Sequence, residues 1–110
     1  MLRRLILAFI LACAILGSPE IQAYVCSIQA IGMAVRPCLD DPTRRCPHKE
    51  YEYRGEGRSS DVREARALAL RDCEAFVIES YAGDRYIMST YRQHTCPMIV
   101  ARGYIECLQH

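Results

Sequence analysis

Cysteine is the residue type whose number and spacing most clearly indicate chemistry in this chain. The 110 residues contain seven cysteines, and six of them follow residue 23. An even number of cysteines in a short exported chain is typical of a disulfide framework. A domain of this size rarely gains more than a few kcal/mol from its core, and three disulfides would add roughly 2–4 kcal/mol each. We therefore predict that six residues are oxidised: Cys26, Cys38, Cys46, Cys73, Cys96 and Cys107.

Histidines near these cysteines raise the question of a metal site. His48 follows Cys38 and Cys46, and His94 precedes Cys96. Zinc sites usually contain closer cysteine pairs, with two residues between the ligands. A disulfide with two exposed histidines is therefore the favoured interpretation, and we predict neither a metal nor a cofactor.

The same histidines could act as a catalytic base. A small hydrolase would need a nucleophile and an orienting carboxylate beside His48 or His94. The spacing of the serines and carboxylates groups none of them with either histidine. An enzyme is therefore the less favoured alternative, and we assign no catalytic residue.

Tyrosine and arginine are the candidate binding residues. The chain has seven tyrosines and no tryptophan, and tyrosine combines apolar contact area with a polar tip that suits interfaces and sugars. Tyrosine is also generally enriched in strands, which is the simpler explanation. The candidates are Tyr51, Tyr53 and Tyr104 on a tyrosine-bearing sheet face, and Arg44 and Arg45 in a basic loop.

Periodicity indicates the elements that would carry these residues. Alternation of apolar and polar residues predicts strands, and Asp61 is a candidate N-cap for one long helix. Three prolines predict a loop after the first strand, and Gly55 and Gly57 are expected to end the second. The predicted order is β-β-α-β-β, an α+β fold with a small antiparallel sheet and one packed helix. The predicted strands are 24–34, 50–56, 86–92 and 98–107, and the helix is 59–82.

This topology favours particular disulfides. Cys38 and Cys46 flank an Asp-Pro turn and form the most natural local pair. The rise per residue of helices and strands places Cys26 near Cys96, which leaves Cys73 for Cys107. Six cysteines allow 15 connectivities, and a bond from Cys26 to Cys73 would contradict the predicted topology.

The first 23 residues resemble an export signal. A basic start, an apolar run of about 12 residues and a small residue at Ala23 fit a cleaved signal peptide, and the run is too short to span a bilayer. Lipid attachment at Cys13, within Ile10–Cys13, is the alternative. We therefore expect a secreted or periplasmic protein with no transmembrane segment, or one anchored at the envelope through Cys13.

Charge and length limit the function of the remaining domain, residues 24–110. Removal of Arg3, Arg4 and Glu20 from 14 basic and 13 acidic residues leaves 12 of each. A chain without net charge is a poor candidate for nucleic-acid binding, which requires surplus Lys and Arg. We predict a single-domain, non-enzymatic binding module with a protein or glycan partner, such as an inhibitor or an envelope-interaction protein.

Overall fold

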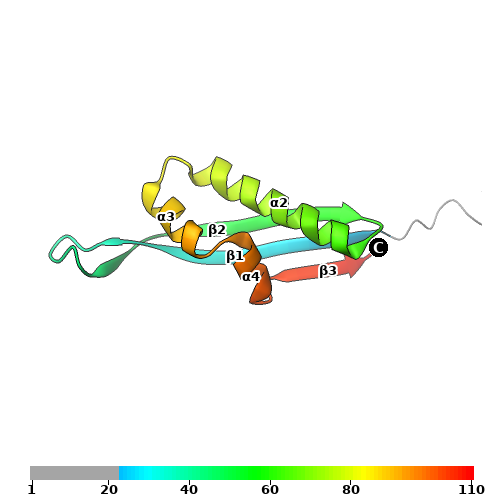
Figure 1. Cartoon of the computed structure of the whole chain (residues 1–110), viewed down its shortest axis with the longest axis horizontal. Coiled ribbons are helices and arrows are strands. Elements are labelled where there is room, and N and C mark those ends of the chain that lie inside the picture. The colour runs from blue at the N-terminus through cyan, green and yellow to red at the C-terminus, as the bar shows by residue number, and fades with distance from the viewer. Residues whose placement is uncertain (1–22) are drawn as a thin grey trace, which may run out of the picture.

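A computed structural model describes residues 23–110 as one antiparallel sheet with three helices (Figure 1). The strand order is β2-β1-β3, and β1 is antiparallel to both neighbours. The α+β class and the antiparallel sheet are confirmed, and the sheet has three strands. The elements are β1 (Tyr24–Pro37), β2 (Arg45–Ser59), α2 (Val62–Tyr81), α3 (Arg85–Gln93), α4 (Cys96–Ala101) and β3 (Ile105–Gln109).

The first two strands form a hairpin that is longer than predicted. The expected loop over 35–49 is strand for most of its length, and the hairpin tip extends beyond α3 (Figure 1). The prolines are compatible with this arrangement. Pro37 is the last residue of β1, and Pro47 lies opposite Val35 beside a register shift. A proline at a strand end or an irregularity removes no ladder hydrogen bond.

One face of the sheet packs against the helices, and the other is open. Cys26, Ile28 and Ala30 alternate with exposed Ser27 and Gln29 along β1. The helix α2 places four buried side chains against this face, and Asp61 caps it by accepting from the Arg63 N–H, as predicted. Those four residues are Ala65, Ala69, Cys73 and Val77.

Two glycines do not end the second strand as expected; they lie within β2 and face α2. A Cβ atom at Gly55 would lie 2.3 Å from the Ala69 carbonyl oxygen. A Cβ atom at Gly57 would lie 2.2 Å from the Ala65 carbonyl oxygen. Their role is therefore close approach of the helix backbone to the sheet.

The two C-terminal strand predictions are wrong over most of their length. Residues 86–92 belong to α3, and 98–101 belong to α4, so only 105–107 of the second segment is strand. The side chain of Asp84 caps α3 by accepting from the Tyr86 and Ile87 N–H groups. Ile87, Thr90 and Tyr91 are buried at helical spacing. The same segment also fits the two-residue alternation of a strand. The periodicity of so short a segment therefore does not distinguish a helix from a strand.

Three disulfides are present, and the local pair Cys38–Cys46 is confirmed. The other two predicted pairs, Cys26–Cys96 and Cys73–Cys107, are wrong. Cys26 bonds to Cys107 on the neighbouring strand, and Cys73 bonds to Cys96. The errors follow from the misassigned segment, because Cys96 begins a helix that packs near α2 instead of returning in a strand.

Candidate functional site

The central strand β1 has a free edge beside the short strand β3. The pairing of β1 with β3 ends at Ile28 and Ile105. The backbone N–H groups of Ala23 and His110 each donate to the other residue's carbonyl oxygen. Because the direction of the backbone groups alternates along a strand, the odd-numbered residues of β1 direct their N–H and C=O groups toward β3. Beyond Ile28, residues 29, 31 and 33 continue this direction without a strand partner among the described residues.

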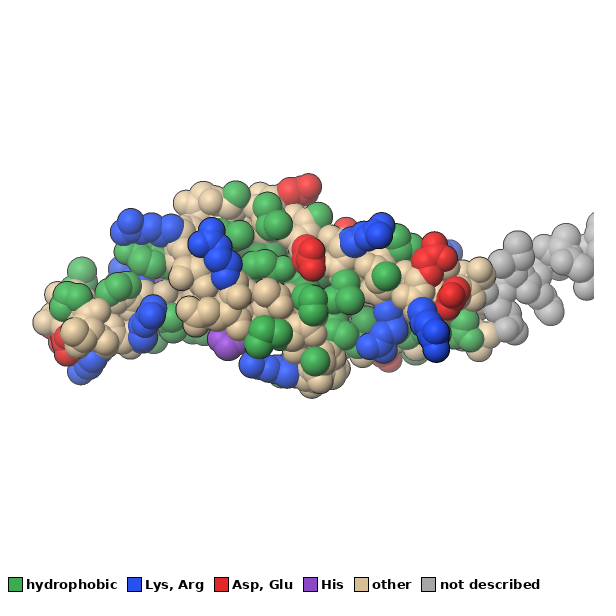
Figure 2. Space-filling model, viewed as in Figure 1, with side chains coloured by type: hydrophobic (Ala, Val, Ile, Leu, Met, Phe, Trp, Pro, Cys, Tyr) green, Lys and Arg blue, Asp and Glu red, His purple; other side chains and the backbone are tan. Residues whose placement is uncertain are grey.

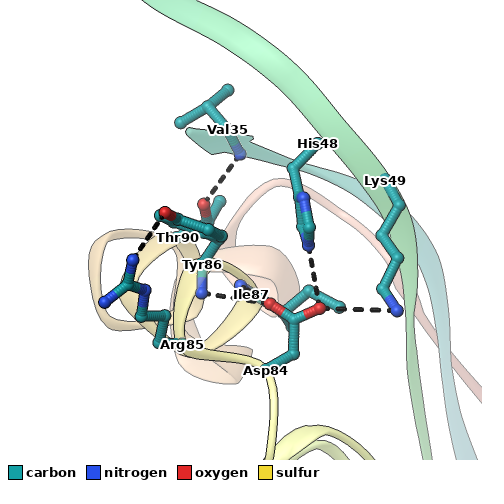
Figure 3. Close-up of polar contacts among 8 residues, drawn as sticks. All are labelled: Val35, His48, Lys49, Asp84, Arg85, Tyr86, Ile87 and Thr90. Carbon is teal, nitrogen blue, oxygen red and sulfur yellow. Dashed lines mark hydrogen bonds and ion pairs between the residues drawn. The ribbon is translucent and has the colours of Figure 1, made fainter. Parts of the chain in front are cut away.

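Nearby outward-facing backbone groups are occupied by side chains of the helices. The Val35 N–H donates to Thr90 Oγ1 of α3 over 3.1 Å (Figure 3). On the outer edge of β2, the Glu52 N–H donates to the Tyr81 hydroxyl and the Glu56 N–H to Asp72. Such capping protects exposed edges from unwanted pairing. The segment 29–33 has no such cap within residues 23–110.

A pocket of about 240 Å³ lies along this free edge, and we call it the edge groove. The residues on its two sides come from α3 and from the segment that joins α4 to β3. The floor includes two tyrosines of β2 that pack across from β1. The lining residues are Ala30, Ile31, Gly32, Met33, Tyr51, Tyr53, Thr90, His94, Ile99, Arg102 and Tyr104.

The floor of the edge groove is a chain of buried hydroxyl groups. Tyr53 donates to the carbonyl oxygen of His94, so its oxygen accepts from the Tyr51 hydroxyl. Burial raises the pKa of Tyr51 and, together with the Tyr51 hydrogen bond, that of Tyr53. Both rings therefore stay neutral near pH 7. Gly32 has no side chain, which leaves space for the Tyr51 ring against β1.

One end of the edge groove carries hydrogen-bond donors. Arg102 Nη2 lies 3.5 Å from His94 Nδ1. Arginine can only donate, so Nδ1 accepts in this long contact and the neutral ring carries its hydrogen on Nε2. Tyr104 is 52% exposed beside them. None of the lining residues is acidic, and none of the ion pairs in residues 23–110 includes Arg102.

A polar cluster attaches the first turn of α3 to β2. Asp84 accepts from His48 Nε2 at 2.8 Å and lies 3.4 Å from Lys49 Nζ (Figure 3). The register shift opposite these two residues lets consecutive side chains reach one carboxylate. The His48 hydrogen bond is the main reason that the pKa of Asp84 falls to about 2. This cluster holds in place the helix that carries Thr90 and precedes His94.

The three predicted tyrosines come together at the edge groove, although Tyr104 precedes β3 and does not lie in a strand. Tyr51 and Tyr53 are 3% and 1% exposed and contribute the floor of the edge groove, and Tyr104 lines its side. Sequence reasoning missed Thr90 and Arg102 as lining residues. The position of Arg102 in a helix-to-strand turn becomes visible only after the fold of its segment is known.

The predicted arginines lie at a different site, the hairpin tip (residues 38–46). Arg44 and Arg45 are exposed there, and Arg44 pairs with Asp40 at 3.4 Å. Leu39 is 92% exposed beside the Cys38–Cys46 disulfide. On the face shown in Figure 2, Lys and Arg side chains are spread along the molecule and do not gather in one patch.

The two histidines of the hydrolase alternative also occupy different places. His48 bonds to Asp84, and His94 lies at the edge groove. No serine or threonine hydroxyl hydrogen-bonds to either ring among the described residues. Within residues 23–110, no group of three or more His, Cys, Asp or Glu side chains could hold a metal ion.

No protein-family model, curated protein or solved structure matches the chain. None of the helices between residues 23 and 110 has the length and hydropathy needed to cross a bilayer. The export signal and the Cys13 lipidation site predicted above lie outside the described residues, apart from Ala23.

Proposed function

We propose that the protein is an exported binding module that captures an extended segment of a partner protein along the edge groove. The segment would add as a strand to residues 29–33 of β1, beside β3. The observation that supports the proposal most is the free edge of β1 next to a pocket, while nearby edge groups are capped by helix side chains.

Strand addition fits the chemistry of this site. Backbone hydrogen bonds to the edge would supply affinity, and the pocket would select side chains of the bound segment. Ile31 is 65% exposed on the open face and would contact the added strand. Three disulfides suit an oxidising, extracellular type of compartment, which fits the predicted signal peptide with cleavage near Ala23.

The test uses random peptides of about eight residues displayed with free carboxyl termini and selected on the oxidised protein. Ile31→Pro removes the central free N–H at a position where an edge strand tolerates proline. We expect this variant to bind the selected peptides about tenfold more weakly, the loss of a well-placed hydrogen bond. Fluorescence anisotropy measures the change.

Matched variants separate the backbone from the side chain and the fold. Ile31→Ala keeps the N–H and removes only the side-chain contact, so its affinity loss should be smaller than that of Ile31→Pro. Met33→Pro provides a second edge variant if Ile31→Pro does not fold, as judged by circular dichroism and disulfide mapping. Unchanged binding by the folded proline variants would contradict strand addition.

Two other outcomes would replace the proposal. Loss of binding in Leu39→Ser, with Ile31→Pro unaffected, would assign the contact to the hairpin tip. A wild-type dimer that Ile31→Pro dissociates in sedimentation experiments would assign the edge to a second copy of the chain. The hydrolase alternative stays a prediction, and turnover that survives replacement of both His48 and His94 would contradict it.

A further inference from the structure

At the donor-rich end of the edge groove, the Arg102 guanidinium donates only in the long contact to His94 Nδ1 among the described residues. Arg102 has no carboxylate partner within residues 23–110, and the lining contains no acidic side chain. The nearby groups that can donate are the Arg102 guanidinium, His94 Nε2–H and the Tyr104 hydroxyl. A ligand that satisfies these groups must be an acceptor.

We infer that this end of the edge groove is a carboxylate site formed by Arg102, His94 and Tyr104. The inference rests on the proposed strand addition, because the carboxylate would belong to the captured segment. It is either the segment's carboxyl terminus or an Asp or Glu side chain. Arginine suits this ligand because its planar guanidinium can donate two parallel hydrogen bonds to a carboxylate.

Electrostatics at the groove floor supports the inference. The positive charge of Arg102 acts on Tyr53, where it opposes the stronger effect of burial on the tyrosine pKa. The guanidinium field therefore reaches the hydroxyl chain at the bottom of the groove. With the neutral tyrosines beneath it, the site presents positive charge and no competing negative charge from its own lining.

The carboxylate site can be tested without any partner segment. N-acetylglycine supplies a carboxylate next to one peptide group, and N-acetylglycinamide is its uncharged control. In NMR titrations of the oxidised protein, we expect saturable shifts of the Arg102 and His94 side-chain signals with the acid only. Arg102→Gln should remove these shifts, whereas Arg71→Gln, an exposed arginine on α2, should keep them.

Selected peptides then identify the source of the carboxylate. A carboxyl-terminal contact predicts about tenfold weaker binding of the peptide amide, the typical loss of a charge-assisted hydrogen bond. A side-chain contact predicts that loss on Asp→Asn or Glu→Gln replacement in the peptide. Either loss should disappear in Arg102→Gln.

Absence of acid-specific shifts would overturn the carboxylate site whatever the peptides do. Some peptides could lose affinity for the Ile31→Pro variant, yet bind the wild type equally well as the acid, as the amide and with Asp→Asn or Glu→Gln replacements. That result would overturn the carboxylate site and leave strand addition in place. Conversely, N-acetylglycine could cause acid-specific shifts while the Ile31→Pro and Met33→Pro variants bind peptides as the wild type does. That result would support the carboxylate site and reject strand addition.

Discussion

At the scale of single residues, Asp84 has two separate structural roles. Its carboxylate caps α3 through the Tyr86 and Ile87 N–H groups, and it also accepts from His48 and lies beside Lys49. Asparagine is nearly as good an N-cap as aspartate. Asp84→Asn therefore removes the charge while it keeps the cap, which separates the two roles.

The charge of Asp84 should make stability depend on pH. Its folded-state pKa is about 2 against an ordinary value of 3.8, so the carboxylate stabilises the fold above pH 4. That contribution is lost as the pH falls from about 4 to 2. We expect Asp84→Asn to melt a few degrees lower at pH 7, with the difference disappearing near pH 2. Thermal melts by circular dichroism across this range measure it.

Glu79→Gln is the matched control, because Glu79 is an exposed carboxylate on α2 that forms no ion pair among residues 23–110. Its melting temperature should follow the wild type at each pH. A constant difference between Asp84→Asn and the wild type from pH 7 to pH 2 would show that the ion pairs do not stabilise the fold.

At the scale of elements, the position of α2 depends on two glycines in β2. A Cβ atom at Gly57 would lie 2.2 Å from the Ala65 carbonyl oxygen and 2.4 Å from the Ala69 nitrogen. These are backbone atoms of the helix, so they cannot move aside as a flexible side chain would. Overpacking of this kind costs about 1–3 kcal/mol.

We therefore expect Gly57→Ala to lower the melting temperature by roughly 4–24 °C, because 1 kcal/mol corresponds to about 4–8 °C in a domain of this size. Gly83→Ala is the matched control, since a Cβ atom there would meet nothing within 4 Å. Differential scanning calorimetry measures both variants. Equal melting temperatures would mean that α2 does not pack on the sheet through these glycines.

The elements also show where sequence patterns succeed. The long helix was predicted within a few residues at each end, because twenty residues contain enough turns to define its period and its Asp61 cap. The nine residues of α3 contain too few turns, and Tyr86–Arg92 alternates as well as it repeats every three to four residues. The decisive feature was the Asp84 cap, which the strand interpretation ignored.

At the scale of the whole molecule, the three disulfides join three different pairs of segments. Cys26–Cys107 closes the sheet, Cys38–Cys46 closes the hairpin tip, and Cys73–Cys96 links the long helix to α4. The last bond fixes the helix that contributes Ile99 to the edge groove and precedes Arg102. Cys73 therefore holds α2 to another helix, and not to the sheet as the sequence suggested.

We expect the Cys73→Ala/Cys96→Ala variant to lose about 2–4 kcal/mol of stability and to exchange the amide hydrogens of α4 faster. The Cys38→Ala/Cys46→Ala variant is the control. It should lose a comparable amount of stability, yet its α4 amides should stay protected from exchange, because the hairpin tip lies beyond α3 (Figure 1). Hydrogen exchange measured by mass spectrometry distinguishes the two variants. Unchanged protection of α4 in the first variant would show that packing alone holds it.

The sequence by itself determined the chemistry of the cysteines, the α+β class, the first hairpin and the long helix. These features depend on composition and on local periodicity, which a single sequence contains. Tyr51, Tyr53 and Tyr104 were also identified as candidates from residue type and predicted strand position, although Tyr51 and Tyr53 are buried and Tyr104 lies outside the strands.

Only the tertiary structure decided how the C-terminal segment folds, and with it the partners of Cys26 and Cys73. It also brought Thr90, His94 and Arg102 to the free edge of β1. The physical reason is that these features depend on strand register and on contacts between distant segments. Alternative strand registers differ by whole residues, and their local sequence patterns can be equally favourable. Packing of the complete chain selects one of them.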